Sequence, residues 1–157
     1  MTTEKKIIGL GVIITAVILV GAVILLSKGN TPAVPKDQII AENGMHWHPK
    51  VLIYIKGEKQ PFEDGIGLNG PVHNPIHTHG DADQDIVHME FEGLVKKEDT
   101  KLAKFFQIWG KQFNSTQIFD KKNGTEGTVK MTVNGRENAE FENYKMRDGD
   151  MIEIKYE

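Results

Sequence analysis

The six histidines of this chain are the residues whose type and spacing point most directly to chemistry. All six lie between His46 and His88 of a 157-residue chain, as His46-Trp-His48, His73-Asn-Pro-Ile-His77-Thr-His79 and the single His88. Neutral imidazole offers a nitrogen lone pair at neutral pH, which makes histidine the commonest metal ligand in proteins. The chain contains no cysteine. The pattern therefore predicts a borderline transition-metal site and excludes a thiolate zinc site or a disulfide framework.

The spacing within the two His-x-His pairs indicates how each pair could share a metal ion. Residues two apart on an extended segment point to the same face. Pro49 and Pro75 favour extended backbone immediately before them. If the strand at Val51 pairs antiparallel with the strand at Val87, the first pair lies near His88, and the loop carrying the second pair closes over the same edge.

Three or four imidazoles converging at that edge would suit zinc, copper or nickel. We predict five metal ligands: His46, His48, His77, His79 and His88. The sequence leaves open whether they form one site or two. For the remaining histidine, His73, we expect a surface or hydrogen-bonding role.

Acidic residues near the histidines have two interpretations. The first set is Asp81, Asp83 and Asp85. These residues could be outer-shell carboxylates that orient the imidazoles, or merely a solvated acidic loop. Glu90 and Glu92 fall on the predicted face of His88, where we expect solvated side chains, with a general base as the alternative.

The ligand types favour copper over zinc by a small margin. Met45 and Met89 each adjoin a histidine, and their soft sulfur would help bind Cu(I). Met89, however, alternates onto the predicted core face, so packing is its expected role. The predicted cofactor is a copper or zinc ion.

The N-terminal segment predicts a single membrane anchor. Residues 7–26, IIGLGVIITAVILVGAVILL, form an uncharged run of the length a transmembrane helix requires. No small-residue cleavage pattern follows it, so we expect an uncleaved anchor. Lys5 and Lys6 favour a cytoplasmic N-terminus, which places the following domain outside the cytoplasm. The sequons at Asn114 and Asn123 are compatible with that location.

The segments that must position the histidines predict a mixed α+β domain. Strands are expected at 51–55, 59–62, 86–92, 128–133 and 151–156. An apolar stripe predicts a helix from about Thr100 to Gly110. The predicted organisation is a transmembrane anchor at 1–28, a linker at 29–37 and a soluble His-rich domain at 38–157.

The C-terminal part resembles the β-grasp, or ubiquitin-like, superfold. Its Val129-Lys-Met-Thr-Val-Asn-Gly135 and Tyr144-Lys-Met-Arg-Asp-Gly-Asp-Met-Ile-Glu-Ile154 segments are similar to the end of the small sulfur carriers of that superfold. The resemblance implies a mixed sheet with one main helix, into which the His-rich loop is inserted. The chain ends at Tyr156-Glu157 rather than in a Gly-Gly tail, so sulfur-carrier activity is not implied.

Four motifs also resemble those of a poorly characterised group of membrane-anchored archaeal and bacterial proteins with His-rich extracytoplasmic domains. The motifs are Met45-His-Trp-His-Pro49, Pro75-Ile-His-Thr-His79, Ile86-Val-His-Met-Glu90 and Phe141-Glu-Asn-Tyr144. The resemblance implies that these motifs form one unit.

Three functional hypotheses follow. The first is a membrane-tethered extracytoplasmic domain that holds or hands on copper or zinc. The second is an accessory or structural subunit of a larger membrane protein complex. The third is a metal-dependent hydrolase or oxidase, although no complete catalytic motif appears and we expect a non-enzyme. A net charge of −3 with both signs interspersed gives no indication of nucleic-acid binding.

Overall fold

The computed structural model describes residues 12–23, 34–68, 70 and 73–157, and contact analysis divides the chain into two units, Met1–Val34 and Pro35–Glu157. In the first unit, residues 12–23 are helical, and the large apolar side chains of that helix are exposed. Within the described part of the chain, no helix combines the length and apolar character needed to cross a membrane. The remainder of the expected anchor, 7–11 and 24–26, lies outside the described residues.

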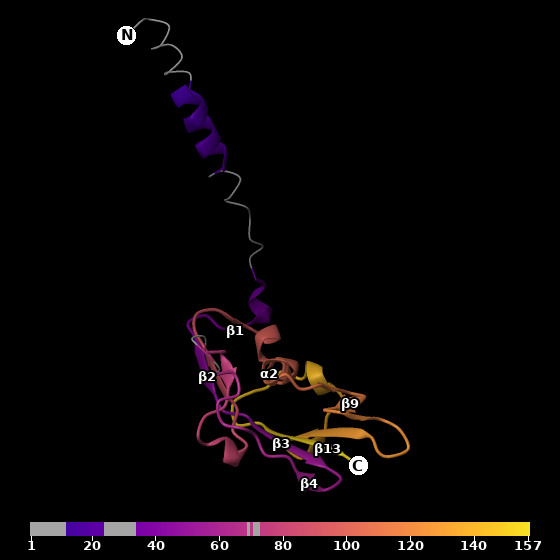
Figure 1. Cartoon of the computed structure of the whole chain (residues 1–157). Helices are drawn as coiled ribbons and strands as arrows, with labels where there is room; N and C mark the ends of the chain where they lie inside the picture. Colours follow the sequence, from indigo (N-terminus) through magenta and orange to yellow (C-terminus); the bar gives the residue numbers. More distant parts are fainter. Residues whose placement is uncertain (1–11, 24–33, 69, 71–72) are drawn as a thin grey trace, which may run out of the picture. The chain divides into compact units, whose positions relative to one another are not determined.

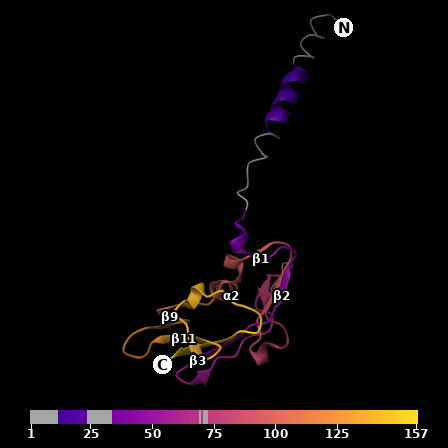
Figure 2. The same cartoon turned by 180° about the vertical axis from the view of Figure 1, so that it is seen from behind.

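The second unit is a mixed α+β structure, as the sequence predicts (Figures 1 and 2). Its helical elements are η1 (Lys36–Gln38), η2 (Ala82–Gln84), η3 (Lys97–Thr100), α2 (Leu102–Trp109) and η4 (Phe141–Asn143). Its strands before α2 are β1 (Ile39–Ala41), β2 (Met45–Trp47), β3 (Lys50–Ile55), β4 (Glu58–Lys59), β5 (Ile76–His77), β6 (His88–Phe91) and β7 (Val95–Lys96). Those after α2 are β8 (Phe113–Asn114), β9 (Gln117–Ile118), β10 (Lys121–Lys122), β11 (Val129–Val133), β12 (Arg136–Glu137) and β13 (Met151–Tyr156).

A five-stranded sheet with the order β12-β11-β13-β3-β4 contains the core of this unit. Its central strands, β3 and β13, pair in parallel, whereas the other neighbours are antiparallel. Alternate side chains of the three inner strands are buried on one face, as a half-buried strand requires: Val51, Ile53, Val129, Met131, Val133, Ile152, Ile154 and Tyr156.

Helix α2 covers the buried face of this sheet (Figures 1 and 2). Leu102, Phe105 and Phe106 follow the helical repeat and are at most 2% exposed. Gly110 ends the helix at a φ of 73°, where its N–H reaches the carbonyls of Phe106 and Gln107. Glycine adopts that backbone conformation without a Cβ penalty.

A three-stranded antiparallel sheet, ordered β2-β6-β5, carries the histidines. The antiparallel pairing considered between the strands at Val51 and Val87 is present only as a short contact. It consists of the antiparallel bridge Lys50–Ile86, with hydrogen bonds from the Val51 amide to the Asp85 carbonyl and from the Val87 amide to the Pro49 carbonyl, both at 2.9 Å. Beyond this bridge, β6 pairs with β2, the short strand before Pro49, and with β5. The strand predicted at 59–62 is instead the two-residue strand β4, Glu58–Lys59.

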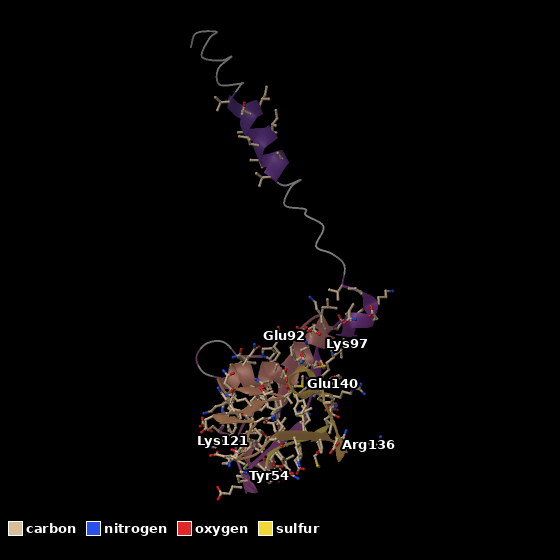
Figure 3. All side chains as sticks on the ribbon, turned by 90° about the vertical axis from the view of Figure 1, so that its right-hand side faces the viewer. Tyr54, Glu92, Lys97, Lys121, Arg136 and Glu140 are labelled. Carbon is tan, nitrogen blue, oxygen red and sulfur yellow. The ribbon has the colours of Figure 1, made fainter. Side chains whose placement is uncertain are left out.

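Most polar side chains of the second unit are exposed or half-buried. Figure 3 shows Glu92 and Lys97 at one end of the unit and Tyr54 at the other. An exception is Asp150, 6% exposed, which accepts hydrogen bonds from Tyr144 Oη at 2.7 Å, the Arg147 amide at 2.8 Å and Asn134 Nδ2 at 3.0 Å. These bonds fix the turn that leads into β13.

The Tyr144–Asp150 hydrogen bond gives the first testable prediction. Burial, together with the hydrogen bond to the Asp150 carboxylate, raises the pKa of Tyr144. A raised folded-state pKa contributes stability below the ordinary tyrosine pKa of about 10, and that stability is lost as pH rises above it. We expect Tyr144→Phe to cost about 1 kcal/mol at about pH 8, and we expect the deficit to shrink above about pH 10. Urea unfolding of both proteins at each pH measures this, and an unchanged deficit would contradict it.

Candidate metal site

The register of the three-stranded sheet places four polar side chains on one face. His46 of β2 lies opposite Glu90 of β6, and His77 of β5 lies opposite His88 of β6. Directly opposed residues point to the same side of an antiparallel sheet, and His88 and Glu90, two apart, share that side as well. The alternate residues Trp47, Met89 and Ile76 are also in register and pack into or against the core.

The same alternation brings the remaining two predicted ligands to this face. His48 follows His46 by two residues, and His79 follows His77 by two residues. The His88 ring is central: its centroid lies 4.5 Å from that of His79, 4.9 Å from His48, 5.8 Å from His77 and 6.3 Å from His46. All five predicted ligands are therefore gathered around one ring.

A carboxylate fixes the orientation of His88. Its Nε2 lies 3.1 Å from both oxygens of Asp81, which begins the η2 turn, so Nε2–H donates to that carboxylate. Burial alone would raise the pKa of Asp81, but the hydrogen bond and the nearby imidazoles outweigh burial and lower it. In neutral His88 the lone pair is then on Nδ1. That atom is buried and has no hydrogen-bond partner among the described residues.

His77 is held in a similar way from the backbone. Its Nδ1–H donates to the Asn74 carbonyl at 2.9 Å, which leaves the lone pair on Nε2. Burial lowers the pKa of His77, so the neutral, ligating form is favoured at neutral pH. His77 Nε2 lies 2.9 Å from His79 Nε2. Two nitrogens bound to one tetrahedral zinc ion lie about 3.3 Å apart, so a small movement of either ring would admit an ion.

Glu90 lies between the histidines, with 43% of its side chain exposed. Its Oε1 is 3.0 Å from His46 Nε2, 3.8 Å from His88 Nδ1 and 4.0 Å from His79 Nε2. Two groups of three could each hold a metal ion, because their ligand atoms lie within 4.8 Å of one another: His46, His48 and His88, and His77, His79 and Glu90.

Several neighbouring residues take other roles. His73 is exposed and belongs to neither group. Asp85, a possible outer-shell residue, instead pairs with Lys59 at 2.7 Å, and Asp83 is exposed. Of the three acidic residues in the loop, Asp81 alone contacts an imidazole among the described residues. Met89 is fully buried in the core, so the prediction that it packs is confirmed.

The participation of Glu90 was missed by the sequence-based interpretation, which expected a solvated side chain. Its position two residues after His88 on an alternating strand was the available signal, but the pairing with His46 is visible only in the sheet register.

Comparisons with known proteins identify no relative of this chain. No protein-family model matches the chain, and neither a curated protein nor a solved structure matches it.

Proposed function

We propose that this chain is a membrane-tethered domain outside the cytoplasm that holds or hands on a copper or zinc ion. The observation that carries the proposal is His88, whose Nδ1 is buried and has no hydrogen-bond partner among the described residues, while its Nε2 binds Asp81. A buried, unpaired polar atom is costly, and a metal ion at Nδ1 would remove that cost. A ligating histidine typically donates its other N–H to a carboxylate, as His88 does to Asp81.

The donor atoms support the choice of metal. Imidazole nitrogen with carboxylate oxygen suits Cu(II) and Zn(II), and neither group of ligands includes sulfur. The buried Met89 sulfur supplies no further preference for Cu(I).

The architecture and the tether belong to the same proposal. The order and pairing of the main elements support a β-grasp fold. The order is the hairpin β3-β4, helix α2, the hairpin β11-β12 and the last strand β13, and β3 and β13 lie parallel at the centre of the sheet. The exposed apolar side chains of the helix over 12–23 support a membrane anchor through residues 7–26. A larger membrane complex remains the expected context for an accessory role.

Metal analysis of the full chain, extracted from membranes with detergent and carrying no histidine tag, tests the proposal. We expect tightly held copper or zinc, retained by His73→Ala and reduced in His77→Ala/His79→Ala. His73 provides the matched control, because it is an exposed histidine outside both groups. Absence of metal after reconstitution with both ions would overturn the proposal, as would unchanged binding in the double variant.

Asp81→Asn gives a prediction on the outer shell. The amide has no charge and presents one oxygen to His88 Nε2, so the imidazole is less firmly oriented and less basic. We expect metal affinity to fall about 10–100-fold with the number of bound ions unchanged. Competition with a chromophoric chelator measures the affinity. Asp83→Asn, an exposed neighbour in η2, is the control, and equal affinities in the two variants would contradict the prediction.

A metal-dependent hydrolase or oxidase is the second candidate. His77, His79 and Glu90 provide three ligands, which leaves an open position on a tetrahedral ion. A hollow of about 480 Å³ borders His77 and Glu90 and could admit a small substrate. In an alternative arrangement the histidines alone hold the ion and Glu90 acts as a general base, and in that case Glu90→Gln should abolish turnover and retain metal.

A further inference from the structure

We propose that the two ligand groups form one dinuclear centre, with the Glu90 carboxylate bridging its two ions. This inference rests on the proposed metal-binding function and deepens it. The first ion would be held by His46, His48 and His88, and the second by His77 and His79.

The number of ligands exceeds what one ion accepts. Five imidazoles and one carboxylate face the same space, whereas zinc in proteins is almost always four-coordinate. The histidines form two close pairs. The ring centroids of His46 and His48 lie 4.5 Å apart, and those of His77 and His79 also lie 4.5 Å apart. The two pairs are separate, because they come from strands on opposite sides of β6. Two metal positions, one on each side of His88, would use all six side chains.

Glu90 is placed to join the two positions. Its Oε1 lies 3.0 Å from His46 Nε2 in the first group and 4.0 Å from His79 Nε2 in the second. A carboxylate has two oxygens, and each can bind a different ion. Ions in two-metal sites lie about 3.5–4 Å apart, a separation that one bridging carboxylate spans.

Nearby negative charge would reduce the repulsion between two divalent cations. Glu90 contributes directly, and Asp81 contributes through its hydrogen bonds with His88. Asp148 Oδ1 lies 4.0 Å from His48 Nδ1 and accepts the His48 backbone N–H at 2.8 Å. Asp81 and Asp148 therefore both lie beside the first group, and Glu90 lies beside both groups.

The two positions differ in how completely the protein surrounds them. With Glu90 the first ion would have four protein ligands, and the second would have three. The second position borders the hollow of about 480 Å³ lined by His77 and Glu90. The second ion is therefore the one that would exchange with solvent or a partner.

Copper(II) titration of the full chain under air, without a histidine tag, tests the bridge. Elemental analysis after desalting gives the number of ions, and electron paramagnetic resonance shows whether they interact. We expect two coppers per wild-type chain, with a spin-coupled signal whose integrated intensity is below that of two isolated ions. His73→Ala should match the wild type.

Each half of the centre has its own variant. His46→Ala/His48→Ala and His77→Ala/His79→Ala should each retain one copper with an uncoupled signal. Glu90→Gln, a similar-sized change at an exposed side chain, should lose the coupling and weaken the second ion at least about tenfold. Circular dichroism verifies that each variant is folded, and Glu90→Gln provides a test if a double variant fails to fold.

The possible outcomes separate the two proposals. One copper in the wild type, or two uncoupled coppers, would overturn the bridge and leave the proposed function in place. Retention of coupling in Glu90→Gln would also overturn it. No copper in the wild type, and no zinc after reconstitution, would overturn both.

Discussion

Replacement of His88 by phenylalanine is expected to abolish tight binding of the ion held with His46 and His48, while leaving the metal-free protein nearly as stable as the wild type. In the metal-free fold, Nδ1 of His88 is buried and has no hydrogen-bond partner in the described part of the chain, and an aromatic ring without that atom removes the cost of burying it. The hydrogen bond to Asp81 is lost as well, but that carboxylate is 32% exposed and can be hydrated. We expect metal-free stability within about 1.5 kcal/mol of the wild type.

Loss of a direct ligand should cost more affinity than loss of an outer-shell partner, so we expect a decrease of at least about 100-fold. An ion at 100 times its dissociation constant stabilises a fold by about 2.7 kcal/mol, and the increment from the first ion should be present in the wild type and absent in His88→Phe. Urea unfolding with and without zinc measures both quantities. His73→Phe, at an exposed histidine outside the site, should keep the increment. A large loss of metal-free stability in His88→Phe would indicate a structural histidine instead.

Gly67→Ala is expected to damage both the fold and the second ligand group. Gly67 has a φ of 81°, and an added Cβ would lie 2.7 Å from the Ile76 carbonyl oxygen and 3.2 Å from His77 Cβ. The Gly67 carbonyl also accepts both the backbone N–H and the side-chain amide of Asn74, whose own carbonyl holds His77. We expect a loss of about 2–4 kcal/mol in the free energy of unfolding.

Gly65 provides the matched control for this substitution. Its φ is 76°, but among the described residues no atom beyond its two chain neighbours lies within 4 Å of an added Cβ. Gly65→Ala should therefore show only the backbone strain of about 1–2 kcal/mol. Metal titration should show weaker binding at His77 and His79 in Gly67→Ala and little change at His46 and His48. Equal effects of the two alanines on stability would exclude the close contact as the cause.

The parts of the fold that the sequence predicted well are those where periodicity and burial agree. Strand β11 and strand β13 alternate over five and six residues, and helix α2 has a continuous apolar stripe that ends at Gly110. Strands β8, β9 and β10 were not predicted, because two residues are too few to show an alternation.

The sequence predicted which histidines form the candidate site, but it did not predict the strand register that brings them together. Alternation predicts that His46 faces the same way as His48, whichever strand lies beside them. The choice of partner for each strand depends on tertiary packing: the segment before β6 meets β3 at the Lys50–Ile86 bridge, and β6 itself pairs with β2 and β5. The position of Glu90 opposite His46 follows from that choice and could not be obtained from spacing alone.

The chain between the two His-x-His pairs includes a long loop, and metal binding at both pairs would restrain that loop. The described part of the segment 60–75, which leads from β4 to β5, contains no helix or strand. Ions that joined His46 and His48 to His77 and His79 would act as a reversible crosslink across this loop. The entropy of closing such a loop grows only with the logarithm of its length, so the long connection adds little to the cost of assembling the centre. Metal loading would then lower the susceptibility of this loop to proteases more than that of the β-sheet core.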